Sequence, residues 1–279
     1  IHIGPPKTGT TAIQDYMCDV KNKDFHMPSS FWLDRIHHGI HTVARVFANP
    51  SSSEDRELIQ KEILESKKEI TIISDESLAL LHSWGGIVSQ THFKKHVGST
   101  PDKIIDNLVN TFRIFDTKVV FYYRNQLDAL ESLYFQHIKR YIDLEKHTLE
   151  EALDFGSLSG TALRERAAYD FGAIHNFWSS KFGEENVLFR LYDRAHLKCG
   201  NIVADFCDMV GIPYAPRPEE GSRDMNSTHQ YLERGAVIRK NKELCLELKK
   251  YYFENNQKFA SLLPEKSKCV FMRGVETDE

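Results

Sequence analysis

The first eleven residues, IHIGPPKTGTT, constrain this chain more than any other stretch. Residues 1–4 are short and apolar like a buried strand, and an apolar face with helical spacing begins at Ile13. Between them lies a glycine- and proline-rich loop with a lysine and a threonine pair. Backbone N–H groups and the helix dipole favour an anion at such a strand–loop–helix junction. We therefore expect a phosphate-binding loop here, in preference to a turn that only caps the helix.

The position of the lysine narrows the kind of phosphate. Gly4 and Gly9 have the spacing of the nucleotide-triphosphatase pattern GxxxxGK[ST]. However, Thr10 stands at the lysine position, and the loop lysine is Lys7. A triphosphatase lysine reaches the β- and γ-phosphates from the first helical turn, whereas Lys7 projects from the loop itself. The shift predicts a shorter anion than a triphosphate.

Strand-like and helix-like segments alternate along the rest of the chain. β-Branched or apolar runs predict strands at 69–74, 119–123 and 186–192. Apolar periodicity predicts a helix over 51–69, with Leu58, Ile59, Ile63 and Leu64 as its inner stripe. It also predicts a helix that opens at Thr100, one after 123, a pair over 149–181, one over 202–210 and a helical tail over 228–259. This alternation predicts an α/β fold with a parallel central sheet flanked by helices on both faces. We expect one domain, 1–279, with a mostly helical C-terminal part from about 213.

Bulk properties exclude some classes of partner. The formal net charge of −4 argues against a nucleic-acid polymer bound over the whole surface. The five cysteines are scattered without metal-ligand spacing, so no zinc site is expected. No stretch approaches the roughly 18 apolar residues that span a bilayer. We expect no membrane segment in these residues, and the sequence does not indicate an oligomeric state.

A second candidate phosphate contact follows the predicted strand 119–123. Arg124 ends that strand, and Ser132 lies about two turns into the next helix. Ligands of open α/β sheets bind at the carboxyl edge of the strands, and a guanidinium beside a hydroxyl suits a dianionic phosphate monoester. An arginine at a strand end is by itself more often a surface ion pair, but the loop on the same edge favours the phosphate.

The loop KTGTT and the strand ending in R-x7-S resemble the sulfotransferases that use 3′-phosphoadenosine 5′-phosphosulfate (PAPS). The resemblance implies a P-loop NTPase-like sulfotransferase fold, with PAPS as donor and 3′,5′-bisphosphoadenosine (PAP) as product. It assigns the 5′-phosphosulfate to the loop and the 3′-phosphate to Arg124 and Ser132. In the loop these roles fall on Lys7, Thr8, Gly9, Thr10 and Thr11. The run FRLYD resembles a later strand of the family, whose tyrosine contacts the adenine, and this role falls on Tyr192.

The run ESLYFQHIK after the arginine is closer in style to carbohydrate and bacterial sulfotransferases than to cytosolic phenol or steroid enzymes. The acceptor implied is a hydroxylated molecule, either a carbohydrate or a small metabolite, although N-sulfation stays open. The RKG motif that completes the 3′-phosphate site in cytosolic enzymes is not evident. Arg273-Gly274 stands without its preceding context, so the third contact to that phosphate stays open.

Sulfuryl transfer to a hydroxyl needs a base for the acceptor proton and a cation for the leaving oxygen. The predicted strand 69–74 ends in Ser-Asp-Glu at the same sheet edge, and Glu76 is the first choice for the base. This position resembles the catalytic glutamate of several carbohydrate sulfotransferases. Asp75 and His82 are the alternatives, and the carboxylate pair has a plain reading as a helix cap. Lys7 is the expected cation, and no metal is required.

Two other functions remain open at this point. An apolar strand followed by Asp-Glu also resembles the metal-binding strand of a P-loop kinase or ATPase, with Asp75 holding Mg²⁺ beside ATP. A nucleotide-binding domain without catalysis is the third reading. The misplaced lysine and the Arg124/Ser132 pair argue against the kinase.

Overall fold

The computed structural model describes residues 1–5, 7–19, 24–28, 47, 52–81, 101–132, 169–216 and 242–273. The named strands are β1 (Val119–Tyr123) and β2 (Val187–Leu191). The α-helices are α1 (Thr10–Asp19), α4 (Ser52–Glu65), α7 (Pro101–Phe112), α11 (Phe171–Phe182), α12 (Ile202–Val210), α15 (Lys242–Ala260) and α16 (Glu265–Met272). The short 3₁₀-helices are η2 (Glu76–Leu80), η3 (Glu184–Asn186) and η4 (Lys198–Gly200). Residues 126–132 are also helical.

The strands run parallel, with the first residues of the chain in the middle. β1 and β2 pair from Val119↔Val187 to Tyr123↔Leu191. On the other side of β1, His2 forms parallel bridges to both Val120 and Ser74. A further parallel bridge joins residues 26 and 71. The spatial order is therefore 26, 71–74, 2, 119–123 and 187–191, and the expected strands at 1–4 and 69–74 take part through these bridges.

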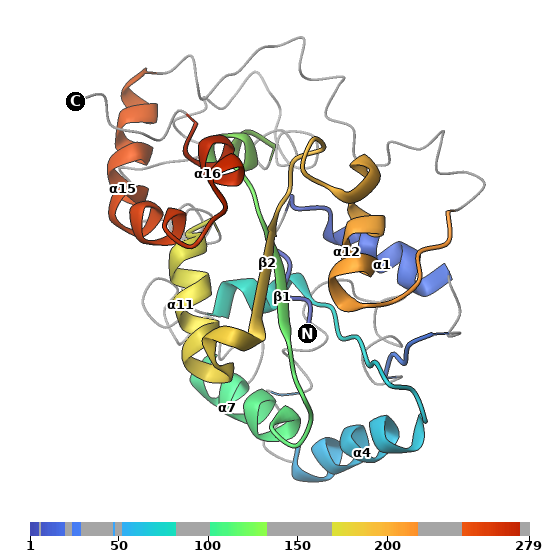
Figure 1. Ribbon diagram of the computed structural model, residues 1–279. Coiled ribbons are helices and arrows are strands. Elements are labelled where there is room, and N and C mark those ends of the chain that lie inside the picture. The colour runs from blue at the N-terminus through green and yellow to red at the C-terminus, as the bar shows by residue number, and fades with distance from the viewer. Residues whose placement is uncertain are drawn as a thin grey trace, which may run out of the picture.

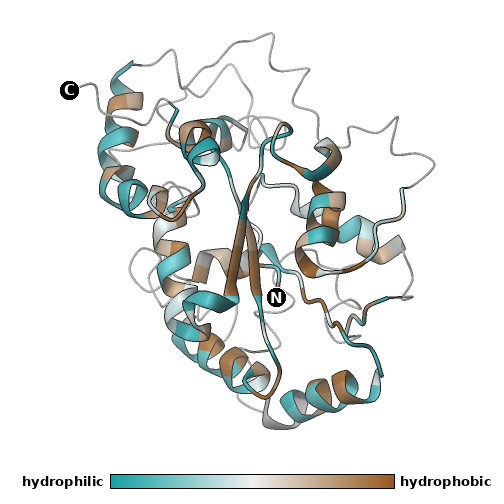
Figure 2. Ribbon diagram, viewed as in Figure 1, coloured by the Kyte–Doolittle hydropathy of each residue, from teal (hydrophilic) through white to brown (hydrophobic). Residues whose placement is uncertain are grey.

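Alternate side chains of β1 face two separate apolar cores, one on each side of the strands. Val119, Phe121 and Tyr123 pack with α7, α11, α15 and α16. Val120 and Tyr122 pack with α1 and α12. Figure 1 shows these two groups of helices on opposite sides of β1 and β2, and Figure 2 shows that both strands are apolar. Strands covered on both faces are the expected α/β class, which is confirmed.

The sequence was wrong about the inner stripe of α4. Ile59 is 1% exposed, whereas Leu58 is 61% and Leu64 67% exposed. Adjacent helical residues point about 100° apart, so an apolar pair such as Leu58-Ile59 does not by itself define the buried face. The helix also ends at Glu65, four residues earlier than expected.

Other helices agree with the sequence to differing degrees. The bounds of α12 are those expected, and Asn201 caps it by accepting from the N–H groups of Val203 and Ala204. The expected tail helix corresponds to α15 in its second half, while 217–241 lie outside the described residues. Helix α16 was not predicted. In the described ranges no helix is both long enough and apolar enough to cross a membrane.

Candidate active site

The loop after the first strand position is folded tightly against two other segments. Gly9 has φ = 83°, and a Cβ atom there would lie 2.7 Å from Cγ1 of Ile202 and 2.9 Å from Cε2 of Tyr192. Glycine is therefore required at this position both for its conformation and for its size. Lys7 has φ = 66°, a left-handed conformation that a lysine seldom adopts. Strain of this kind, which costs on the order of 1 kcal/mol, is concentrated at ligand-binding sites.

The three loop threonines have different surroundings. Thr8 is buried, and its hydroxyl donates to the carbonyl oxygen of Pro5 over 2.6 Å, so it braces the loop from inside. Thr10 is buried, and its hydroxyl has no hydrogen-bond partner among the described residues. Thr11 is exposed in the first turn of α1. The N–H groups of a first helical turn lack partners within the helix, so this turn presents donors at the loop.

Arg124 and Tyr192 lie against the loop, as the sequence predicted for the carboxyl edge. A guanidinium N–H of Arg124 donates to the carbonyl oxygen of Lys7 over 3.1 Å. The guanidinium carbon lies 5.5 Å from the centre of the Tyr192 ring. The N–H of Tyr192 donates to the carbonyl oxygen of Tyr123 over 2.7 Å. The loop and the carboxyl ends of β1 and β2 therefore meet at one point.

Ser132 lies in the helical stretch that begins at Gln126, and it is buried. The helix begins two residues after Arg124. Its first residue, Gln126, forms a reciprocal pair of amide hydrogen bonds with Asn256 of α15. Within the described chain, the structure shows no hydrogen bond between Ser132 and the loop. Its assignment to a phosphate stays a prediction.

The candidate bases lie at the end of the neighbouring strand. The N–H of Asp75 donates to the carbonyl oxygen of His2 over 3.1 Å, which places the pair beside the loop strand. The Asp75 side chain is 6% exposed, whereas Glu76 begins η2 and is partly exposed. Glu76 is therefore the more accessible carboxylate of the two. His82 lies outside the described residues.

Asn125 helps to build the edge of the site beside Arg124, and no sequence motif predicted this role. Its side-chain amide donates to the carbonyl oxygens of Phe271 over 3.0 Å and Arg273 over 2.8 Å. These bonds hold the end of α16 beside Arg124, and Figure 1 shows α16 near the carboxyl end of β1. The only signal in the sequence was Arg273-Gly274, which lacked the context of the family motif.

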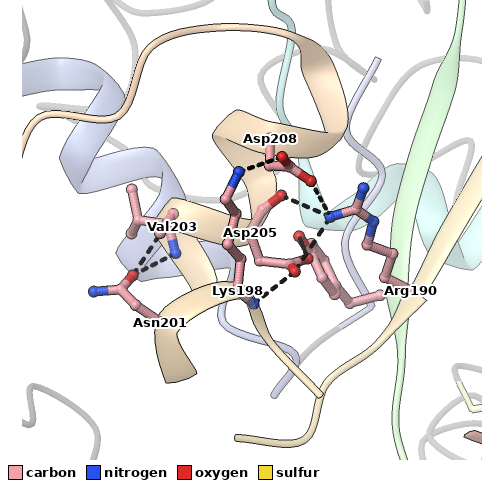
Figure 3. Close-up of polar contacts among 8 residues, drawn as sticks. Arg190, Lys198, Asn201, Val203, Asp205 and Asp208 are labelled. Atoms are coloured by element: carbon pink, nitrogen blue, oxygen red, sulfur yellow. Dashed lines mark hydrogen bonds and ion pairs between the residues drawn. The ribbon is translucent and has the colours of Figure 1, made fainter. Parts of the chain in front are cut away.

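A second arginine nearby has a different environment. Arg190 of β2 pairs with Asp205 over 3.2 Å and with Asp208 over 2.9 Å, both on α12. The backbone N–H of Lys198 and the hydroxyl of Tyr122 also donate to Asp205. Figure 3 shows Arg190 and Lys198 converging on the carboxylates of Asp205 and Asp208. Burial and the hydrogen bond to Asp205 raise the pKa of Tyr122, so the hydroxyl keeps its proton and donates it to the carboxylate. The ion cluster of Arg190, Asp205 and Asp208 therefore ties β1 and β2 to α12.

The described ranges contain no group of three or more His, Cys, Asp or Glu residues placed to hold a metal ion.

Comparisons with known proteins agree with the fold. The family model described as "Sulfotransferase domain" matches residues 1–242. A similar solved structure is a sulfotransferase from Alicyclobacillus acidocaldarius, at 14% identity and a TM-score of 0.51, covering 93% of each chain. A search among curated proteins finds no match. At this identity the structural likeness supports the fold alone, whereas the family match covers most of the chain. The chain therefore belongs to the sulfotransferase family and is an enzyme of sulfuryl transfer.

Proposed function

We propose that this enzyme transfers the sulfuryl group of PAPS to a hydroxyl of a carbohydrate or another hydroxylated metabolite. The observation that carries the proposal is the packing of Arg124 and Tyr192 against the loop that contains Lys7 and Gly9. A guanidinium and an aromatic ring beside a lysine-containing loop at the carboxyl edge suit a ligand that combines phosphates with a base.

The donor is proposed to lie across this edge in two parts. Lys7 and the first turn of α1, with Thr8, Gly9, Thr10 and Thr11, take the 5′-phosphosulfate. Arg124 and Ser132 take the 3′-phosphate, and the ring of Tyr192 contacts the adenine. Within the described residues the contacts of Arg124 are a carbonyl oxygen and an aromatic ring, so its charge is available for an anion.

Arg273 is the candidate for the missing third contact to the 3′-phosphate. Its carbonyl oxygen is held by Asn125, the residue after Arg124. Its side chain is exposed at the end of α16. A second guanidinium there would add to the charge that neutralises the phosphate.

The transfer itself needs a base and a charge-stabilising cation. Glu76 accepts the proton of the acceptor hydroxyl as its oxygen forms a bond to sulfur. The bond between sulfur and the bridging oxygen breaks, and Lys7 stabilises the charge that develops on that oxygen. The sulfuryl group carries less charge than a γ-phosphoryl group, so this mechanism requires no metal ion.

Ligand-dependent melting tests the donor. PAP without Mg²⁺ should raise the melting temperature, because binding at 100 times Kd adds about 2.7 kcal/mol to the free energy of unfolding. ATP with Mg²⁺ is the matched control, and it should stabilise the protein only if the site is that of a kinase. No shift with millimolar PAP would contradict the proposal.

A transfer assay tests the acceptor and the base. Labelled PAPS is offered with sugars, phenols and amines, using the wild-type enzyme and the variants Glu76→Gln and Asp75→Asn. We expect transfer to a sugar or another hydroxyl, and loss of turnover in Glu76→Gln without loss of PAP binding. Full activity in Glu76→Gln would remove Glu76 from the mechanism, and transfer confined to amines would make the enzyme an N-sulfotransferase.

A further inference from the structure

His2 lies in the central strand position and contacts the segment that carries the candidate base at three points. Its side chain is 1% exposed, and Nδ1 lies 2.8 Å from the hydroxyl oxygen of Ser74. Its backbone N–H donates to Ile73, and its carbonyl oxygen accepts from Asp75. The ring thus fixes the residue that immediately precedes Asp75 and Glu76.

The opposite edge of the same ring faces the phosphate loop. A Cβ atom added to Gly4 would lie 2.9 Å from Nε2 of His2 and 2.2 Å from the Thr10 hydroxyl oxygen. The loop backbone therefore rests directly on the imidazole, with room for glycine alone. Phe206 of α12 packs edge-on against the ring, with the centroids 5.2 Å apart, so the ring is enclosed on three sides.

Gln14 shares the Ser74 hydroxyl with the imidazole of His2. Gln14 of α1 donates to the carbonyl oxygen of Ser74 and, over 3.1 Å, to its hydroxyl oxygen. The Ser74 hydroxyl thus lies between the Gln14 amide and Nδ1 of His2, while Nε2, on the loop side, has no hydrogen-bond partner among the described residues. Burial lowers the pKa of His2 to about 3. The ring is consequently neutral at ordinary pH and carries no charge toward a bound anion.

We propose that His2 is a positioning residue that sets the phosphate loop relative to the base segment Ser74–Glu76. It acts through Gly4 on one side and Ser74 on the other, and it touches neither donor nor acceptor. In-line transfer requires the base and the bridging oxygen to be held at a fixed separation, and an error of about 1 Å costs on the order of 100-fold in rate. The inference rests on the proposed function in one respect, the role of Glu76.

Three variants separate positioning from simple packing. His2→Phe keeps the ring volume but has no nitrogen, His2→Asn places an amide where Nδ1 lies, and Ser74→Ala removes the partner. We expect kcat to fall at least about 10-fold in His2→Phe and Ser74→Ala, with PAP affinity changed less than about threefold. His2→Asn should recover most of kcat. The double variant His2→Phe/Ser74→Ala should be no worse than either single one, because both break the same contact.

The contrary results are equally defined. Wild-type kcat in His2→Phe would overturn the proposal, as would parallel losses of kcat, PAP affinity and melting temperature that His2→Asn does not recover. Amide hydrogen exchange decides the matter without any donor: His2→Phe should speed exchange at residues 73–76, and His2→Asn should not. If the wild-type enzyme binds no PAP, the proposed function fails, while the exchange result still supports or overturns the role of His2.

Discussion

Arg124 directly follows β1 and Arg190 lies in the neighbouring strand β2, but the two arginines have opposite surroundings. Arg190 is paired with two aspartates, one of which also accepts from Tyr122 and from the backbone of Lys198. Arg124 contacts the carbonyl oxygen of Lys7 and the ring of Tyr192. A guanidinium already neutralised by carboxylates stabilises the fold, whereas one held by neutral groups keeps its charge for a ligand. Substitutions beside the loop, at Lys7 or Arg124, should therefore impair ligand binding or turnover, whereas substitutions in the ion cluster around Arg190 should lower stability.

The largest effect is expected from the loop lysine. Lys7→Ala should lower kcat by about 100- to 1000-fold, since it removes the cation at the leaving oxygen. Its melting temperature should stay close to that of the wild-type protein, because the side chain is not part of either core. Steady-state kinetics with a thermal melt measure both, and Lys61→Ala, a substitution of an exposed lysine on α4, is the control. A Lys7→Ala enzyme with normal turnover would exclude Lys7 from the mechanism.

The next effect concerns stability alone. Asp205→Ala should lower the free energy of unfolding by about 3 kcal/mol, because it leaves the Tyr122 hydroxyl, a backbone N–H and part of the Arg190 charge without partners. PAP affinity should be unchanged. Urea unfolding with calorimetric titration of PAP gives both quantities. Asp208→Ala is the matched control on the exposed side of the cluster, and its loss should be smaller and should shrink with added salt. Equal losses in the two variants would contradict the ranking.

A third prediction compares the two arginines directly. Arg124→Ala should weaken PAP binding by about 10- to 100-fold, which corresponds to the loss of a charged hydrogen bond. Arg190→Ala should bind PAP normally and unfold more easily, because Asp205 then loses its paired cation. Both are measured by calorimetric titration and urea unfolding of the same two proteins. If Arg124→Ala destabilises the fold while binding stays normal, Arg124 belongs with the structural arginine.

The last prediction concerns the pH dependence of stability, to which His2 contributes. Its pKa is about 3 in the folded protein, against an ordinary value of 6.5, so between these values the unfolded chain binds a proton that the folded chain refuses. The His2 contribution to stability is therefore complete above pH 6.5 and is lost as the pH falls toward 3. The slope is at most about 1.4 kcal/mol per pH unit. His2→Phe should flatten the pH dependence of urea unfolding in this window, and an unchanged slope would show that the histidine titrates normally.

Local patterns in the sequence predicted the parts of the molecule that depend on neighbouring residues. Strand 119–123 and helix 202–210 were located correctly, because β-branched runs and an asparagine cap act within a few residues. The contact of Arg124 with the loop followed from the rule that parallel strands present their carboxyl ends together. The stripe of α4 was wrong, because adjacent leucine and isoleucine residues do not reveal which of them faces the core.

Contacts between residues far apart in sequence could not be predicted from local sequence patterns. Asn125 reaches the end of α16 across 146 to 148 positions, and no motif marks it. Asp205 looks like an ordinary first-turn acid of α12, and only the fold brings Tyr122 and Arg190 to it. The contact of His2 with Gly4 and Ser74 also required the order of the strands.

The bonds of Asn125 have a consequence for the order in which the molecule assembles. Closing a loop of this length costs chain entropy before any contact compensates for it, so such contacts form late in folding. The pairing of β1 with β2, from Val119 to Val187, closes a shorter loop and is expected to consolidate first. The segment beside Arg124 therefore reaches its final arrangement only when α16 docks. A chain still emerging from the ribosome would already contain the loop, yet the contacts of Asn125 would form only after residue 273 had been released.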